Sequence, residues 1–166
     1  AIACALFNQP VESWTGTGTG LDKKGLSSKI SVIKSALQLH GQEFQSTESI
    51  LGSLGGREIA AIVGSIIAAR LLRIPVLLDG FICTSAAATL TIFYKNILDH
   101  CLISHLSTEP GHCGLLSYID KKPILDLNLR LGEGSGAAIA SLRIRSSLAI
   151  HNGMATSSEA GVSKKK

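Results

Sequence analysis

The chain has 166 residues, of which 45% are apolar, 17% charged and 4% aromatic, and its formal net charge is +4. These values are typical of one globular α/β domain with a buried sheet. The scarcity of aromatic residues excludes a stacking platform for single-stranded nucleic acid. Three of the positive charges belong to Lys164, Lys165 and Lys166, so no basic stripe remains to favour nucleic acid as a partner. We expect residues 160–166 to form a disordered basic tail.

A glycine-rich segment, TGTGTGLD, occupies residues 15–22. Its spacing is not the GxGxxG dinucleotide fingerprint, because the third glycine comes one residue early. Its backbone N–H groups and threonine hydroxyls could still hold a phosphate. Lys29, on the helix predicted to follow, could reach back to that anion. The competing interpretation is a flexible connector with a solvated helix lysine.

Apolar residues at helical spacing alternate with short apolar runs along the rest of the chain. The pattern predicts helices over 55–72, 81–96, 114–119 and 135–150, strands over 76–78, 101–103 and 124–131, and a polar loop over 104–112. Helices between successive strands favour parallel strands with right-handed crossovers. The expected fold is a parallel, Rossmann-like α/β sheet flanked by helices, in a single domain over 1–166.

Polar residues are expected at the carboxyl ends of these strands, where ligands of open α/β sheets bind. Asp79 follows the first strand and either bonds a ligand hydroxyl or caps a turn. Ser107 is expected at the same edge as a polar contact. A catalytic triad of Ser107, His105 and Asp79 is not expected, because there is no GxSxG motif and adjacent loop residues seldom meet as nucleophile and base.

The segment LRLGEGSGAA over 129–138 places Glu133 in a glycine-rich turn between a strand and a helix. The glycines allow a tight turn, and Ser135 is expected to cap the helix, so that backbone N–H groups point into the same space. A lone carboxylate in this position suits a general base. A solvated loop glutamate is the competing interpretation.

The four cysteines and five histidines do not have the spacing of metal ligands, so no metal site is expected. The cysteines are expected to be reduced core thiols. His105 and His112 flank a proline–glycine turn and have either a structural role or a place in a pocket. The opening AIACALF is too short for a membrane span and has no basic leader, and its abrupt start suggests a fragment.

Six segments in order resemble the nicotinate-nucleotide–dimethylbenzimidazole phosphoribosyltransferases. They are GTGTGLD with GLSSK, GGREIAAIVGSIIAARL, IPVLLDGFICTSAA, HCLISHLSTEPGH, LDLNLRLGEGSGAA and HNGMATSSEAGVS. The resemblance covers almost the whole chain, but family members are about twice as long, so the chain resembles their carboxy-terminal half. It implies a homodimer in which the terminal helices belong to a smaller second domain. Departures from the family pattern are Ser157, where a phenylalanine is usual, and the segment 141–143.

The resemblance also implies roles for individual residues. Glu133 matches the catalytic base; Gly18, Thr19, Lys29 and Gly80 match positions that bind the phosphate or ribose; Ser107 matches another substrate contact; Leu131 and Gly132 match the wall beside the aromatic base. The implied reaction transfers the phosphoribosyl group of nicotinate mononucleotide to 5,6-dimethylbenzimidazole. It needs no cofactor or metal, and it implies a cytoplasmic enzyme without a membrane or nucleic-acid partner.

Two other classes of function stay open at this point. One is a nucleotide-binding oxidoreductase on a similar sheet, which the glycine spacing disfavours. The other is a truncated, non-catalytic relic of the transferase.

Overall fold

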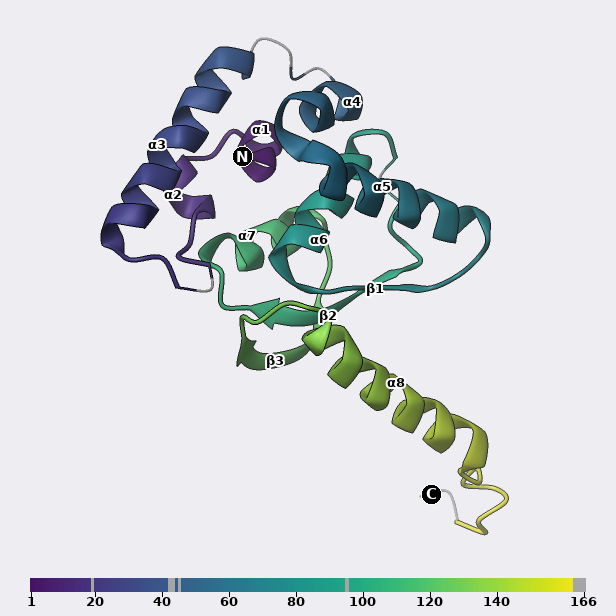
Figure 1. Ribbon diagram of the computed structural model, residues 1–166. Helices are drawn as coiled ribbons and strands as arrows, with labels where there is room; N and C mark the ends of the chain where they lie inside the picture. The colour runs from purple at the N-terminus through teal and green to yellow at the C-terminus, as the bar shows by residue number, and fades with distance from the viewer. Residues whose placement is uncertain (19, 42–43, 45, 95, 163–166) are drawn as a thin grey trace.

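The computed structural model describes residues 1–162 apart from 19, 42–43, 45 and 95 (Figure 1). Its centre is a parallel three-stranded sheet in the order β1–β2–β3, formed by Val76–Leu78, Cys101–Ser107 and Pro123–Leu129. Helices connect the strands and flank the sheet, as parallel pairing requires. The expected parallel α/β fold is therefore confirmed.

The helices follow the predicted order, with four additional short ones near the amino terminus. They are α1 Ile2–Phe7, α2 Val11–Trp14, α3 Lys23–His40, α4 Thr47–Ile50, the π-helical η2 Leu51–Gly55, α5 Gly56–Leu71, α6 Gly80–Ala88, the 3-10 turn η3 Thr89–Ile92, α7 Pro110–Tyr118 and α8 Ser135–Gly153. Helix α7 begins at Pro110, four residues earlier than predicted. Proline favours the first helical position, where its missing N–H has no intrahelical partner to lose.

Strand β2 is longer than predicted, because it continues through the polar segment 104–107 that we expected to be a loop. The side chains of Ser104 and His105 are buried there, and each has a polar partner: Ser104 Oγ donates to the Leu78 carbonyl at 2.8 Å, and His105 lies against Asp79. Buried polar groups are tolerated when they are hydrogen-bonded. The pairing of β2 with β3 shifts register between His105 and Ser107, so the last pair, Ser107 with Leu129, follows an irregularity in the ladder.

Two hydrophobic cores hold these layers together. The first joins α5 and α6 to the sheet through residues such as Val63, Ile66, Leu78 and Ile103. The second lies between α1, α2, α6 and α7 and is centred on Trp14, with partly buried residues of α3 packed against it. The second core places the glycine-rich segment between α2 and α3 near the carboxyl ends of the strands.

Helix α8 projects away from the body of the molecule (Figure 1), and Gly136 and Ala140 are its buried residues. The helical stretch Thr47–Leu71 is long and apolar enough to cross a membrane by length and composition. A single such helix is a weak indication by itself; Val63 and Ile66 of this stretch pack into the first core, although only 17% of its most apolar 18-residue window is buried.

The remaining structural expectations have mixed outcomes. All four cysteines are free; Cys4 and Cys101 are buried, but Cys113 is exposed, so the expectation of a core thiol was wrong there. Residues 163–166 of the expected tail lie outside the described residues. The assignment of the terminal helices to a second domain stays a prediction.

Candidate active site

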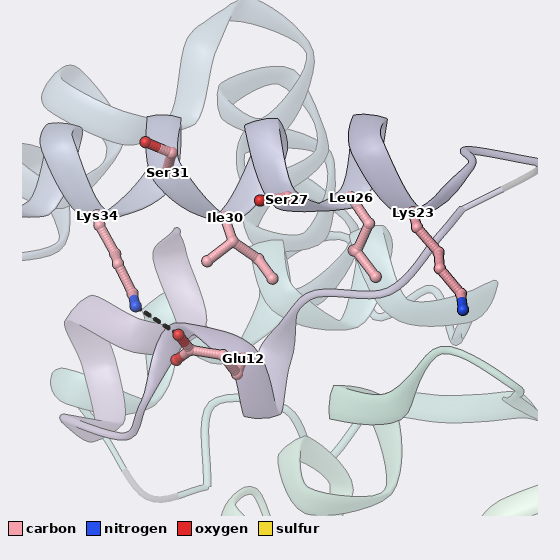
Figure 2. A pocket seen from close by; sticks show the side chains of 7 residues that line it. All are labelled: Glu12, Lys23, Leu26, Ser27, Ile30, Ser31 and Lys34. Carbon is pink, nitrogen blue, oxygen red and sulfur yellow. Dashed lines mark hydrogen bonds and ion pairs between the residues drawn. The ribbon is translucent and has the colours of Figure 1, made fainter.

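A shallow groove between α2 and α3 encloses about 500 Å³ and is lined by Glu12, Lys34 and five other residues (Figure 2). Lys34 forms an exposed ion pair with Glu12, and this hydrogen bond holds the pKa of the Glu12 carboxyl below its usual range. Exposed ion pairs contribute little to stability or to binding. None of the described residues predicted for the site lines this groove, so it is not the candidate site.

A larger cavity of about 700 Å³ lies at the carboxyl ends of the strands. Eight of the predicted site residues line it, namely Gly18, Lys29, Asp79, Gly80, Ser107, Leu131, Gly132 and Glu133. The ninth, Thr19, lies outside the described residues. Segments far apart in the sequence therefore meet at one hollow, in the position where open α/β sheets bind ligands.

The glycine-rich segment 15–22 forms one wall of this cavity. Lys29 reaches back from α3, and its Nζ donates to the Gly16 carbonyl at 3.1 Å. Arg130 approaches from the end of β3, and its Nη2 donates to the Gly18 carbonyl at 2.8 Å. Asp22 caps α3 by accepting a hydrogen bond from the Gly25 N–H, and its negative charge makes the helix N-terminus less favourable for an anion. The side chains of Lys29 and Arg130 and the backbone of the loop are therefore the better anion-binding groups. Arg130 was not predicted from the sequence.

Glu133 lines the same cavity, in a turn with three successive left-handed residues. Its φ is +58°, and those of Gly132 and Gly134 are +75° and +76°. A left-handed conformation costs a residue with a side chain about 1–2 kcal/mol, and such strain is concentrated at functional sites. The expectation that Ser135 caps α8 was wrong, because its hydroxyl donates to the Gly132 carbonyl at 2.7 Å and holds the turn instead.

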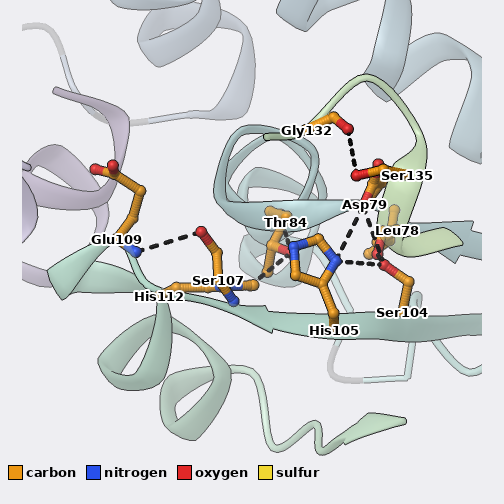
Figure 3. Close-up of polar contacts among 11 residues, drawn as sticks. Leu78, Asp79, Thr84, Ser104, His105, Ser107, Glu109, His112, Gly132 and Ser135 are labelled. Atoms are coloured by element: carbon orange, nitrogen blue, oxygen red, sulfur yellow. Dashed lines mark hydrogen bonds and ion pairs between the residues drawn. The ribbon is translucent and has the colours of Figure 1, made fainter. Parts of the chain in front are cut away.

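Asp79 occupies the N-cap position of α6, but its side chain makes no capping hydrogen bond, so the capping alternative for this residue was wrong. Its Oδ1 lies 3.0 Å from Nδ1 of His105 (Figure 3). His105 is 1% exposed and lines the cavity floor. A buried histidine inside a strand gave no signal in the sequence beyond its place next to a turn.

A second buried histidine connects two residues of the cavity wall. His112 Nδ1 accepts from the Ser107 backbone N–H at 2.9 Å, so its Nε2 carries the proton and faces Thr84 Oγ1 at 3.2 Å. The Thr84 hydroxyl in turn donates to the Gly80 carbonyl at 2.7 Å. Burial first, and the neighbouring His105 second, lower the pKa of His112 to about 4. His112 is therefore neutral near pH 7 and has a structural role.

Acidic side chains outnumber basic ones around the cavity. The described lining residues include Glu58, Asp79, Glu109 and Glu133 against Lys29 and Arg130. Glu109 lies beside the glycine-rich wall, where a Cβ on Gly16 would be 2.9 Å from its Cδ. Among the described residues, no group of three or more histidine, cysteine or acidic side chains could hold a metal ion.

The family model described as phosphoribosyltransferase matches residues 1–162. The curated protein named nicotinate-nucleotide–dimethylbenzimidazole phosphoribosyltransferase from a Ruegeria species is 53% identical over 163 residues, or 98% of this chain. The chain belongs to the nicotinate-nucleotide–dimethylbenzimidazole phosphoribosyltransferase family.

Other members of the family agree with this assignment. The protein of the same name from Methylorubrum extorquens is 52% identical over 98% of this chain. The crystal structure of CobT from Thermus thermophilus matches 99% of this chain with a TM-score of 0.89 and 36% identity. The chain spans about half the length of these relatives, covering 48% of the first two and 49% of the third, and it corresponds to their carboxy-terminal half.

The fold also bears on the oxidoreductase alternative. A dinucleotide fingerprint joins a β-strand to a helix, whereas the glycine-rich segment here follows helix α2. The geometry therefore disfavours that alternative, as the glycine spacing did.

Proposed function

We propose that the protein to which this chain belongs transfers the phosphoribosyl group of nicotinate mononucleotide to 5,6-dimethylbenzimidazole, giving α-ribazole 5′-phosphate and nicotinate. The observation that supports this most is the single cavity shared by the cationic glycine-rich wall and Glu133. Such a cavity can hold a phosphate at one side and an aromatic base at the other.

Glu133 is the general base of this proposal. One nitrogen of the benzimidazole attacks C1′ of the ribose while its other nitrogen loses a proton to Glu133. The bond from C1′ to the pyridine nitrogen breaks, and its electron pair neutralises the positively charged ring, so nicotinate leaves without a general acid. One carboxylate is sufficient for this proton transfer. Holding both substrates in line adds to the rate through proximity.

The other residues bind and orient the substrates. Lys29 and the segment containing Gly18 and Thr19 hold the phosphate, with Arg130 positioning that segment. Gly80 contacts the phosphate or the ribose, Ser107 makes another substrate contact, and Leu131 and Gly132 form the wall beside the base. Leu131 is 66% exposed in this chain, so it has apolar surface available for an aromatic ring.

The remaining expectations belong to the same proposal. The enzyme is a cytoplasmic homodimer that uses no cofactor or metal and has no membrane or nucleic-acid partner. The relatives are bacterial enzymes named for small-molecule substrates, and this supports the small-molecule part of the proposal.

The decisive experiment mixes this chain with a separately produced amino-terminal half of a relative and assays for α-ribazole 5′-phosphate. We expect the mixture to form product and this chain alone to bind weakly and turn over little. A folded complex of the two halves that stays inactive would favour the non-catalytic relic. Calorimetry with NAD and with nicotinate mononucleotide separates the transferase from the oxidoreductase.

A further inference from the structure

The two carboxylate oxygens of Asp79 have different surroundings. Oδ1 lies 3.0 Å from Nδ1 of His105, whereas Oδ2 is buried and has no hydrogen-bond partner among the described residues. The side chain is 10% exposed and lines the large cavity. Oδ2 faces the glutamate turn, since a Cβ on Gly134 would lie 4.0 Å from it. The protein thus presents one shielded acceptor atom at the cavity floor.

The direction of the hydrogen bond at Oδ1 follows from Ser104. The Ser104 hydroxyl has one hydrogen, which it donates to the Leu78 carbonyl at 2.8 Å in preference to the 3.3 Å contact with Asp79. Toward His105 Nδ1, at 3.1 Å, the serine oxygen can then only accept. Nδ1 must therefore carry a proton, which it shares between Ser104 Oγ and Asp79 Oδ1; Figure 3 marks both contacts.

Packing fixes the imidazole in this position. Gly136, in the first turn of α8, lies against the ring so closely that a Cβ there would be 2.6 Å from Cε1 and 2.7 Å from Cγ. A Cβ on Gly80 would lie 3.6 Å from the same Cε1 atom. These neighbours and the contacts of Nδ1 with Ser104 and Asp79 restrict the ring, so it holds the Asp79 carboxylate in one orientation.

A buried hydrogen-bond acceptor without a partner lowers the stability of a protein by about 1–3 kcal/mol. Such an acceptor needs an explanation, and a ligand that supplies the missing donor is one. In nicotinate mononucleotide the two ribose hydroxyls are the donors, because the carboxylate and phosphate are anionic acceptors and the quaternary ring nitrogen has no hydrogen. We propose that His105 is a positioning residue that orients Asp79 so that Oδ2 accepts a hydrogen bond from a ribose hydroxyl. This inference rests on the proposed function.

The test compares nicotinate mononucleotide with its 2′-deoxy and 3′-deoxy analogues in NMR titrations of the 166-residue chain. The variants are Asp79→Asn, His105→Gln, which removes the donor at Nδ1, and His105→Asn, whose amide nitrogen replaces Nδ1. We expect the parent chain to bind one deoxy analogue about tenfold to a hundredfold more weakly than the ribonucleotide. Asp79→Asn and His105→Gln should abolish this difference, and His105→Asn should retain most of it.

The matched control is His100→Gln, which changes a half-buried histidine outside the cavity and should leave the difference unchanged. Amide spectra report whether each variant keeps the fold. If a His105 variant binds all three ligands more weakly by the same factor, His105 has only a structural role and the inference is overturned. Equal binding of all three ligands by the parent would overturn it too, while leaving the proposed function intact. A parent that binds none of them, both alone and when mixed with the amino-terminal half, contradicts the proposed function and the inference together.

Discussion

Gly136 packs directly against the imidazole of His105, with no space between them for a methyl group. We expect Gly136→Ala to lower the free energy of unfolding by about 1–3 kcal/mol, because the added Cβ overlaps a ring that cannot move. Chemical denaturation measures the change. The matched control is Gly64→Ala in α5, where a Cβ meets nothing within 4 Å. That substitution should stabilise by about 0.5–1 kcal/mol, and equal effects at both glycines would contradict the packing argument.

Replacing Glu133 by glutamine tests the proposed base. In the reconstituted enzyme we expect turnover to fall by about two to four orders of magnitude, because the amide cannot accept the benzimidazole proton. The affinity for nicotinate mononucleotide should change little. Glu12→Gln, in the shallow surface groove, removes the same charge elsewhere and should leave turnover unchanged. Near-normal turnover in Glu133→Gln with substrate binding intact would rule out this residue as the base.

Glu109 places a negative charge beside the glycine-rich wall that we propose to bind phosphate. Glu109→Gln should therefore tighten binding of nicotinate mononucleotide about fourfold, the effect of ~0.8 kcal/mol expected for two unit charges about 5 Å apart in water. Lys29→Met should have the opposite effect and weaken binding about tenfold to a hundredfold. Both effects should shrink at high salt. Calorimetric titration measures them, and weaker binding by Glu109→Gln would place the phosphate elsewhere.

His112 should make the stability of the chain sensitive to mild acid. Its pKa is about 4 in the folded state and about 6.5 in the unfolded chain, so below pH 6.5 the unfolded chain takes up a proton that the folded state does not. Above about pH 6.5 this residue does not lower the free energy of unfolding. Between about pH 6.5 and about pH 4.5, the free energy of unfolding should fall by about 2 kcal/mol from this residue alone. In His112→Asn, which keeps an acceptor for Ser107 N–H, that part of the loss should disappear. Denaturation curves at both pH values test this, and parallel losses in parent and variant would contradict it.

Much of the fold could be predicted because its main elements carry local signals. Apolar residues at helical spacing located α5, the short apolar run over 76–78 located β1, and the parallel arrangement followed from the alternation of elements. The extension of β2 could not be predicted, because Ser104 and His105 look like loop residues until Leu78 and Asp79 supply their partners. Pro110 did carry a signal for the start of α7, which the sequence analysis overlooked.

The site was predictable to a similar extent. Glycine-rich turns and strand ends identified both walls of the cavity, because these features follow from backbone geometry that the sequence encodes locally. Arg130 and Glu109 were missed, and His105 was left between a structural role and a place in a pocket. The importance of these residues comes from contacts with Gly18, Gly16 and Asp79 that only the tertiary structure creates.

The hydrogen bond between Arg130 and Gly18 joins residues that are 112 positions apart in the chain. Bringing such distant segments together has an entropic cost that grows with their separation, and contacts of this kind form after local ones during folding. We therefore expect the cavity to assemble late, after the first and last parts of the chain have acquired their own local structure. A compact state that contains the sheet and its helices but lacks the contact between Arg130 and Gly18 would not yet have this cavity wall.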